Sequence, residues 1–216
     1  MTAETATLSP APCVFVIDDD DAVRDALSMF LAAEGFNCRS FSSADEFLRF
    51  REGDERGCLI LDVRMAGTSG IELQQELRQL DSHLPIIFLT GHGDVPMAVD
   101  AMRQGAFDFL RKPVNENDLL NCVRQALEQE DRVWGKHCNM TLLRARAASL
   151  TAREAEIFGR VAEGSPNKAI AIELGISERT VEVHRAQVMK KLGVRTLAEL
   201  VRSHLALSDR ADARGS

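Results

Sequence analysis

The first 128 residues alternate five times between a short apolar run and a segment with helical periodicity, which limits the folds open to the chain. The clearest run is Cys58 to Leu61, which leads into Asp62 and then into turn residues around Gly67. A short apolar run bounded by turn residues is typical of a strand buried on both faces. Repeated strand–helix units favour a parallel sheet with helices on both faces. The sequence therefore predicts a doubly wound α/β fold here.

The other strands are expected at residues 14–17, 38–41, 85–89 and 107–110. Helices are expected between them, at 44–50 and 96–104 and around the apolar positions of residues 23–31, 73–80 and 120–127. The result is a five-stranded sheet in which every crossover is right-handed, so that all strands end at one edge.

Polar side chains stand where four of these strands end: Asp18 and Asp19, Asp62, Thr90 and Lys112. Clustered carboxylates repel one another unless a cation joins them, and hard oxygen ligands suit Mg²⁺. A carboxylate, a hydroxyl and an ammonium beside such an ion are suited to phosphoryl transfer, with Asp62 as the nucleophile that becomes an aspartyl phosphate. The alternative is a solvated acidic loop with a lysine salt bridge.

Charge divides the chain into two halves. Residues 1–128 hold 22 acidic and 11 basic side chains, whereas residues 129–216 hold 11 acidic and 15 basic ones. Two units with different partners are therefore expected. The five cysteines form no CxxC pair and are typical of a reducing compartment. No apolar run approaches the roughly 20 residues of a membrane span, and residues 1–12 form a polar tail without the features of a signal peptide. We expect a cytoplasmic protein with no membrane partner.

From Leu150 the pattern changes to short helices with no strands between them. Thr151 and Glu154 have the spacing of a capping box, and glycines such as Gly175 end successive helices. Two short helices joined by a tight turn are typical of a helix-turn-helix, although any small helical bundle can show this pattern. For residues 129–149 a helical extension and a tether both remain open, and Trp134 is expected to pack rather than to recognise a partner.

Residues 13–128 resemble the receiver domain of two-component response regulators. The family's acidic pair matches Asp18 and Asp19, its phosphoacceptor Asp62, its hydroxyl Thr90 and its lysine Lys112, which precedes a proline as in the family. The resemblance implies a flavodoxin-like sheet of order 2-1-3-4-5.

The same resemblance implies roles for further residues. Phe109 matches the aromatic switch residue, and the backbone carbonyl of Arg64 would join the aspartates around Mg²⁺. Ala66 departs from the proline that is usual before Gly67, which removes no ligand. Arg64 and His92 stand two residues after the phosphoacceptor and the hydroxyl, and we hypothesise that they tune the lifetime of the phosphate.

Residues 150–207 resemble the LuxR-type helix-turn-helix of the FixJ class. The matching signature includes Leu150-Thr151, Asn167-Lys168, Thr180-Val181 and Val183-His184. Helical periodicity places Val181, Val188 and Leu192 on one side of the third helix. Base contacts are expected from the opposite side, and phosphate contacts from neighbouring positions. The DNA-binding candidates are Lys168, Arg179, Thr180, Glu182, Val183, Arg185, Ala186, Gln187 and Lys190. Of these, Arg185 could reach a phosphate or pair within the domain.

These observations predict a transcriptional response regulator. A sensor histidine kinase would phosphorylate Asp62, Thr90 would turn inward, and Phe109 would rotate into the space it leaves. By resemblance, this change promotes homodimerisation and binding to promoter DNA, with RNA polymerase as a further partner. The rivals are a receiver switched by something other than phosphate, an aspartyl-phosphate hydrolase, and a stand-alone phosphorelay module. Arg64 opposes the hydrolase because those enzymes have a second Asp at that position, so no enzyme is predicted beyond slow self-dephosphorylation.

Overall fold

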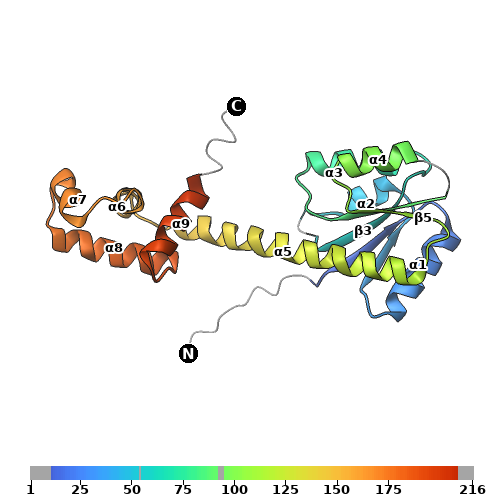
Figure 1. Cartoon of the computed structure of the whole chain (residues 1–216), viewed down its shortest axis with the longest axis horizontal. Coiled ribbons are helices and arrows are strands. Elements are labelled where there is room, and N and C mark those ends of the chain that lie inside the picture. The colour runs from blue at the N-terminus through green and yellow to red at the C-terminus, as the bar shows by residue number, and fades with distance from the viewer. Residues whose placement is uncertain (1–10, 54, 92–94, 209–216) are drawn as a thin grey trace. The chain divides into compact units, whose positions relative to one another are not determined.

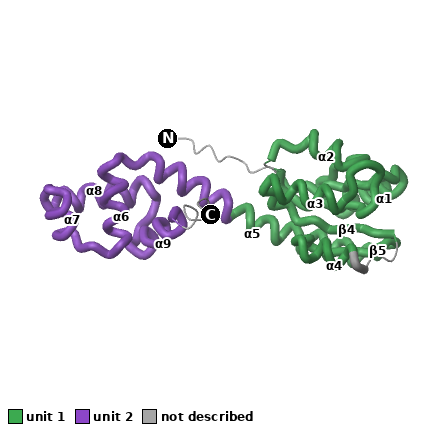
Figure 2. The backbone as a smooth tube through the Cα atoms, turned by 90° about the horizontal axis from the view of Figure 1, so that it is seen from above, with its two compact units in different colours: residues 1–135 green, residues 136–216 purple. Residues whose placement is uncertain are grey.

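The computed structural model describes residues 11–53, 55–91 and 95–208. The chain divides into two compact units, residues 1–135 and 136–216 (Figure 2). Each unit has its own hydrophobic core.

Unit 1 is a five-stranded parallel sheet of order β2-β1-β3-β4-β5, with helices on both of its faces (Figure 1). The strands are β1 (Cys13–Ile17), β2 (Cys38–Phe41), β3 (Gly57–Asp62), β4 (Ile86–Thr90) and β5 (Asp108–Arg111). The helices that alternate with them are α1 (Asp21–Ala33), α2 (Ala44–Phe50), α3 (Gly70–Gln79) and α4 (Val95–Arg103), and α5 (Glu116–Ala148) follows β5. The predicted fold class and strand order are confirmed.

Burial on both faces explains why β3 is a continuous apolar run. Leu59 and Leu61 pack into one core cluster with side chains of α2, α3 and α4. Cys58 and Ile60 point to the other face, into a cluster with side chains of α1 and α5. Successive side chains of a strand alternate between the faces of a sheet, so a strand covered on both sides needs apolar residues at every position. β3 is the central strand of the sheet.

Two glycines let the ends of β3 approach their neighbours closely. A Cβ atom on Gly57, whose φ is +132°, would lie 1.7 Å from the carbonyl oxygen of Cys13. A Cβ atom on Gly70, the first residue of α3, would lie 2.2 Å from the carbonyl oxygen of Asp62. The backbone at both ends of the central strand is therefore packed too tightly for any side chain at these positions.

α5 is one helix of 33 residues. Its first part buries Leu119, Val123 and Ala126 in the core of unit 1, and Leu143 and Ala147 near its end pack against the core of unit 2. A helical extension and a tether were both open for residues 129–149, and the structure shows a helical extension that runs to Ala148. Within the described parts of the chain, no helix combines the length and the apolar character that crossing a membrane requires.

Unit 2 is helical throughout its described residues. After the end of α5 it consists of α6 (Ala152–Ala162), α7 (Asn167–Leu174), α8 (Glu178–Leu192) and α9 (Leu197–Ser208). The predicted capping box is present at α6, where the Thr151 hydroxyl accepts from the backbone N–H of Glu154 and the Glu154 carboxylate accepts from the N–H of Thr151. Gly175 ends α7 in the left-handed conformation, with φ of +64°, and the chain turns there into α8.

Candidate functional sites

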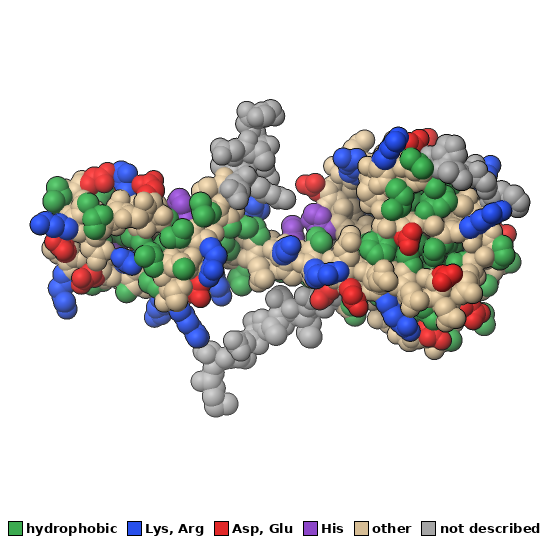
Figure 3. Space-filling model, in the orientation of Figure 1, with side chains coloured by type: hydrophobic (Ala, Val, Ile, Leu, Met, Phe, Trp, Pro, Cys, Tyr) green, Lys and Arg blue, Asp and Glu red, His purple; other side chains and the backbone are tan. Residues whose placement is uncertain are grey.

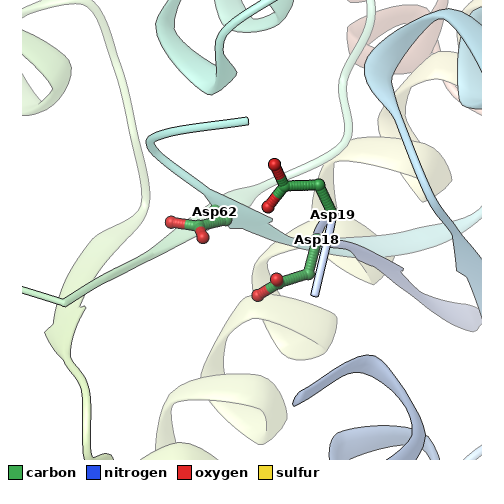
Figure 4. Close-up of side chains that lie close together, drawn as sticks. All are labelled: Asp18, Asp19 and Asp62. Atoms are coloured by element: carbon green, nitrogen blue, oxygen red, sulfur yellow. The ribbon is translucent and has the colours of Figure 1, made fainter. Parts of the chain in front are cut away.

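Three aspartates meet at the carboxyl edge of the sheet in unit 1 (Figure 4). Asp18 and Asp19 follow β1, and Asp62 is the last residue of β3. Each offers a carboxylate oxygen within 4.8 Å of the others. Asp18 is buried, whereas Asp19 is exposed and Asp62 is partly exposed. The cluster is therefore anchored in the protein and open to solvent on one side, as a site for a hydrated cation requires.

Lys112 supplies positive charge to this cluster from the end of β5. Its ammonium donates to Asp18 Oδ2 over 2.6 Å and to Asp62 Oδ2 over 2.9 Å. Burial alone would lower the pKa of Lys112, but the hydrogen bonds to Asp18 and Asp62 outweigh it, so the pKa lies above its ordinary value. Lys112 is consequently a permanent cation at neutral pH, and Asp18 and Asp62 share it.

Thr90 is the last residue of β4, and Phe109 lies on the adjacent strand β5. The Thr90 hydroxyl is buried and has no hydrogen-bond partner among the described residues, although a buried hydroxyl normally has one. The ring of Phe109 packs against Phe88, with 6.1 Å between the ring centres, and is only partly buried. The hydroxyl is thus available to a new acceptor, and the ring is partly open to solvent.

The loop after β3 folds back over the aspartates. The backbone N–H of Ala66 donates to Asp19 Oδ2 over 2.9 Å, and that of Arg64 donates to Asp62 Oδ1 over 3.3 Å. The departure from proline at position 66 therefore supplies an N–H that proline lacks, and Asp19 uses it. The other residue assigned to phosphate lifetime, His92, lies outside the described residues.

In unit 2, the predicted base-contacting residues form the exposed side of α8. Val181, Val188 and Leu192 are buried as predicted. Glu182, Val183, Ala186 and Gln187 are exposed, together with Lys168, Arg179 and Lys190. Several Lys and Arg side chains project from the edge of the unit along which α8 runs (Figure 3). The structure thus presents one convex, partly basic helix surface of the kind that enters a DNA groove.

Two of the DNA-binding candidates have partners inside the unit. Arg185 donates to Asn167 Oδ1 over 3.1 Å, which ties α8 to the start of α7. The Thr180 hydroxyl lies 2.8 Å from that of Ser177, the residue that caps α8. Arg185 therefore takes the second of its two predicted options, pairing within the domain, and Thr180 belongs to the start of the recognition helix.

The sequence did not indicate a partly buried ion pair between α8 and the start of α6. Lys191 donates to Glu154 Oε2 over 2.6 Å and to the carbonyl of Ser149 over 3.2 Å. The hydrogen bond from Lys191, with that from the backbone of Thr151, lowers the pKa of Glu154 to about 2. Glu154 was predicted only as a capping residue, and a Lys on the last turn of α8 is its second partner.

Comparison with known proteins explains why both sites occur in one chain. Residues 14–124 match the family described as response regulator receiver domain. Residues 148–204 match the bacterial regulatory proteins of the luxR family. The chain belongs to the response regulators. The resemblance inferred from the sequence is thereby confirmed, and so is the pairing of a receiver with a LuxR-type DNA-binding domain.

Three relatives show how far this similarity extends. The response regulator protein TmoT of Ectopseudomonas mendocina is 43% identical, over 91% of this chain and 89% of its own. The transcriptional regulatory protein FixJ of Azorhizobium caulinodans is 44% identical, over 89% of this chain and 91% of its own. Among solved structures, the response regulator StyR has a TM-score of 0.81 and 45% identity, and the match covers 89% of this chain and 97% of StyR. This response regulator therefore matches its relatives across both domains.

Proposed function

We propose that this response regulator is switched by transfer of a phosphoryl group from a sensor histidine kinase to Asp62. The contact between Lys112 and Asp62, 2.9 Å long and beside two further aspartates, carries the proposal. An oxygen of Asp62 attacks the phosphorus of the donor, the bond from phosphorus to the donor breaks, and an acyl phosphate results. Lys112 is placed to offset the charge of the phosphoryl oxygens.

The donor set at this site fits Mg²⁺. Asp18, Asp19, Asp62 and the backbone carbonyl of Arg64 would hold the ion, because oxygen ligands on one open side of a site are what this small, hydrated cation takes. When bound, it supplies positive charge to the phosphoryl oxygens during transfer. Lys112 offsets only part of the charge of the three aspartates, and this excess of negative charge supports a cation of more than one charge.

The added phosphate biases a two-state element made of Thr90 and Phe109. The unpartnered hydroxyl of Thr90 turns toward the phosphoryl oxygens and donates to them. The Phe109 ring moves into the space that the threonine leaves. The altered surface then favours homodimerisation, and two copies of the modestly basic α8 surface bind promoter DNA more tightly than one. RNA polymerase is the further partner of this complex.

The test is the intact mass of the full chain after incubation with Mg²⁺ and acetyl phosphate. The wild type should gain one phosphate and Asp62→Asn none, and DNA binding at fixed salt should tighten only for the phosphorylated wild type. Asp45→Asn, an exposed aspartate outside the cluster, is the matched control and should behave as the wild type. An equal gain of mass in the wild type and in Asp62→Asn would contradict the proposal. No gain in either protein would favour a receiver that is switched without phosphate.

A further inference from the structure

α5 is held at the opposite edge of the sheet by a charge cluster whose central pair is buried. Arg56 immediately precedes β3, and its guanidinium makes a two-point contact with Glu130, from Nε to Oε1 over 3.1 Å and from Nη2 to Oε2 over 2.9 Å. The same Nη2 also donates to Asp131 over 2.8 Å. The guanidinium carbon lies 5.4 Å from the centre of the Trp134 ring. We name these four residues the α5 clamp.

The clamp occupies the last buried turns of the helix within unit 1. The stripe of α5 that packs on the sheet passes through Leu119, Val123 and Ala126, and its next buried member is the carboxylate of Glu130, which is 3% exposed. An apolar side chain at this position would continue the stripe with no cost of burying charge. A buried ion pair is a weak source of stability compared with such packing, and its best-established use is to fix register.

Arg56 is itself held by the backbone. The N–H of Cys13 donates to the carbonyl of Arg56 over 2.9 Å, and Gly57 packs against Cys13 too closely for a side chain. The planar guanidinium can satisfy both oxygens of Glu130 in only one orientation. Arg56 therefore sets both the rotation of α5 about its axis and its position along that axis, which apolar contacts alone do not.

We infer that the α5 clamp is a positioning device that joins the segment of α5 from residue 127 to residue 138 rigidly to β3, the strand that ends in Asp62. The helix then leaves the receiver with a fixed start, and a change at the receiver is passed into the part of α5 that follows the clamp. The role in signalling rests on the proposed function, whereas the stiffening of the helix does not.

Hydrogen–deuterium exchange of the full chain tests the stiffening. Arg56→Met should raise amide exchange in residues 127–138 by about tenfold, because one partner of a buried charged pair is lost and that segment opens locally. β1, β3 and β4 should stay better protected than residues 127–138 in the same variant, because core strands exchange only when the whole unit unfolds. Arg124→Met is the matched control, since Arg124 is on the same helix and its ion pair with Glu34 is exposed and 3.8 Å long. Unchanged exchange in Arg56→Met would overturn the inference.

A second variant covers the case in which Arg56→Met fails to fold. Arg56→Lys keeps the charge but cannot make the two-point contact, so it should still raise exchange in residues 127–138, by less than Arg56→Met. If Arg56→Lys exchanges as the wild type does, charge alone suffices and the register role is wrong.

The signalling role is read from DNA binding before and after treatment with Mg²⁺ and acetyl phosphate. Arg56→Met should gain phosphate to the wild-type extent, but the increase in DNA affinity on phosphorylation should be about tenfold smaller than in the wild type, as expected when a coupling free energy of ordinary size is lost. A wild-type increase in this variant would overturn the signalling role. If the wild type takes up no phosphate, the proposed function fails, and the exchange experiment still decides whether the clamp stiffens the helix.

Discussion

The two ends of β3 hold charge clusters of opposite character. At its carboxyl end, three aspartates lie together and Lys112 pairs with two of them, Asp18 and Asp62. The side chains of Lys112 and Asp62 are 21% and 14% exposed. At its amino end, Arg56 meets Glu130 and Asp131 in a fork whose central pair is 9% and 3% exposed. The first cluster is open and too negative, so it can take up a cation and a phosphoryl group. The second is closed and geometrically satisfied, so it fixes a helix. Charge balance and solvent access therefore distinguish a chemical site from a structural one on the same strand.

The largest loss of stability is expected from Gly57→Ala, which places a side chain at the tightly packed amino end of β3. The new Cβ would lie 1.7 Å from the carbonyl oxygen of Cys13, so the sheet must shift, and the receiver should lose about 4 kcal/mol of unfolding free energy or fail to fold. Urea unfolding measures it. Gly53→Ala is the control, because φ is +101° there but no atom of the described residues outside its chain neighbours lies within 4 Å of the added Cβ. It should cost about 1 kcal/mol. Equal losses would mean that backbone conformation, and not the close approach, matters at Gly57.

Breaking the closed cluster should cost less. Arg56→Met leaves Glu130 buried without its main partner, and we expect the receiver to lose about 3 kcal/mol of unfolding free energy. The exposed pair of Arg124 and Glu34 gives the comparison, since Arg124→Met should change stability by less than about 0.5 kcal/mol. Urea unfolding of both variants checks this, and a loss no greater in Arg56→Met than in Arg124→Met would show that the two pairs are equivalent.

The open cluster should respond to Mg²⁺ and the closed one should not. At a Mg²⁺ concentration about 100 times the dissociation constant, binding should stabilise the receiver by about 2.7 kcal/mol. Asp19→Asn removes one ligand and should lose most of this gain, whereas Arg56→Met should keep it. Thermal unfolding with and without MgCl₂ measures the shift. A full Mg²⁺ effect in Asp19→Asn would remove this residue from the ligand set.

The smallest expected effect is a difference in how the stability contributed by each cluster depends on pH. The pKa of Lys112 is raised above 10.5 in the folded protein, so its stabilising contribution is complete below that value and is lost as the pH rises through the folded pKa. The hydrogen bond to Glu130 raises the pKa of Arg56 above its ordinary value, which is already higher than that of a lysine, so its contribution persists to higher pH. The stability difference between wild type and Lys112→Met should therefore shrink above about pH 10.5, while that for Arg56→Met stays constant. If the stability differences for Lys112→Met and Arg56→Met both shrank over the same pH range, the distinction between the two clusters would be wrong.

The open cluster could be predicted from the sequence and the closed one could not. Asp62 and Lys112 are 50 residues apart in the chain, but both stand at strand ends, and parallel topology sends all strand ends to one edge. Arg56 and Glu130 are 74 residues apart, and Arg56 stands before a strand, where polar residues are common. The sequence did contain one indication of this cluster: the charged residue Glu130 stands at a position where the helical spacing of the buried residues of α5 calls for an apolar one. Its partner is set by tertiary packing, which periodicity does not contain.

In unit 2, too, the sequence predicted features within single helices but not the contacts between helices. The apolar side of α8 and the capping box at Thr151 followed from spacing, and both are present in the structure. The contact of Lys191 with Glu154 and that of Arg185 with Asn167 join different helices. Such contacts depend on how the helices cross, so they could be placed only once the packing was known.

The position of Trp134 gives the chain an internal optical probe. The sequence has one tryptophan and no tyrosine, so its fluorescence under near-ultraviolet excitation comes almost entirely from this indole. The ring lies beside the guanidinium of Arg56, 5.4 Å from its centre to the guanidinium carbon, and far along the sequence from both the aspartates and α8. Emission from the unlabelled protein therefore reports on the junction between the receiver and its helical extension.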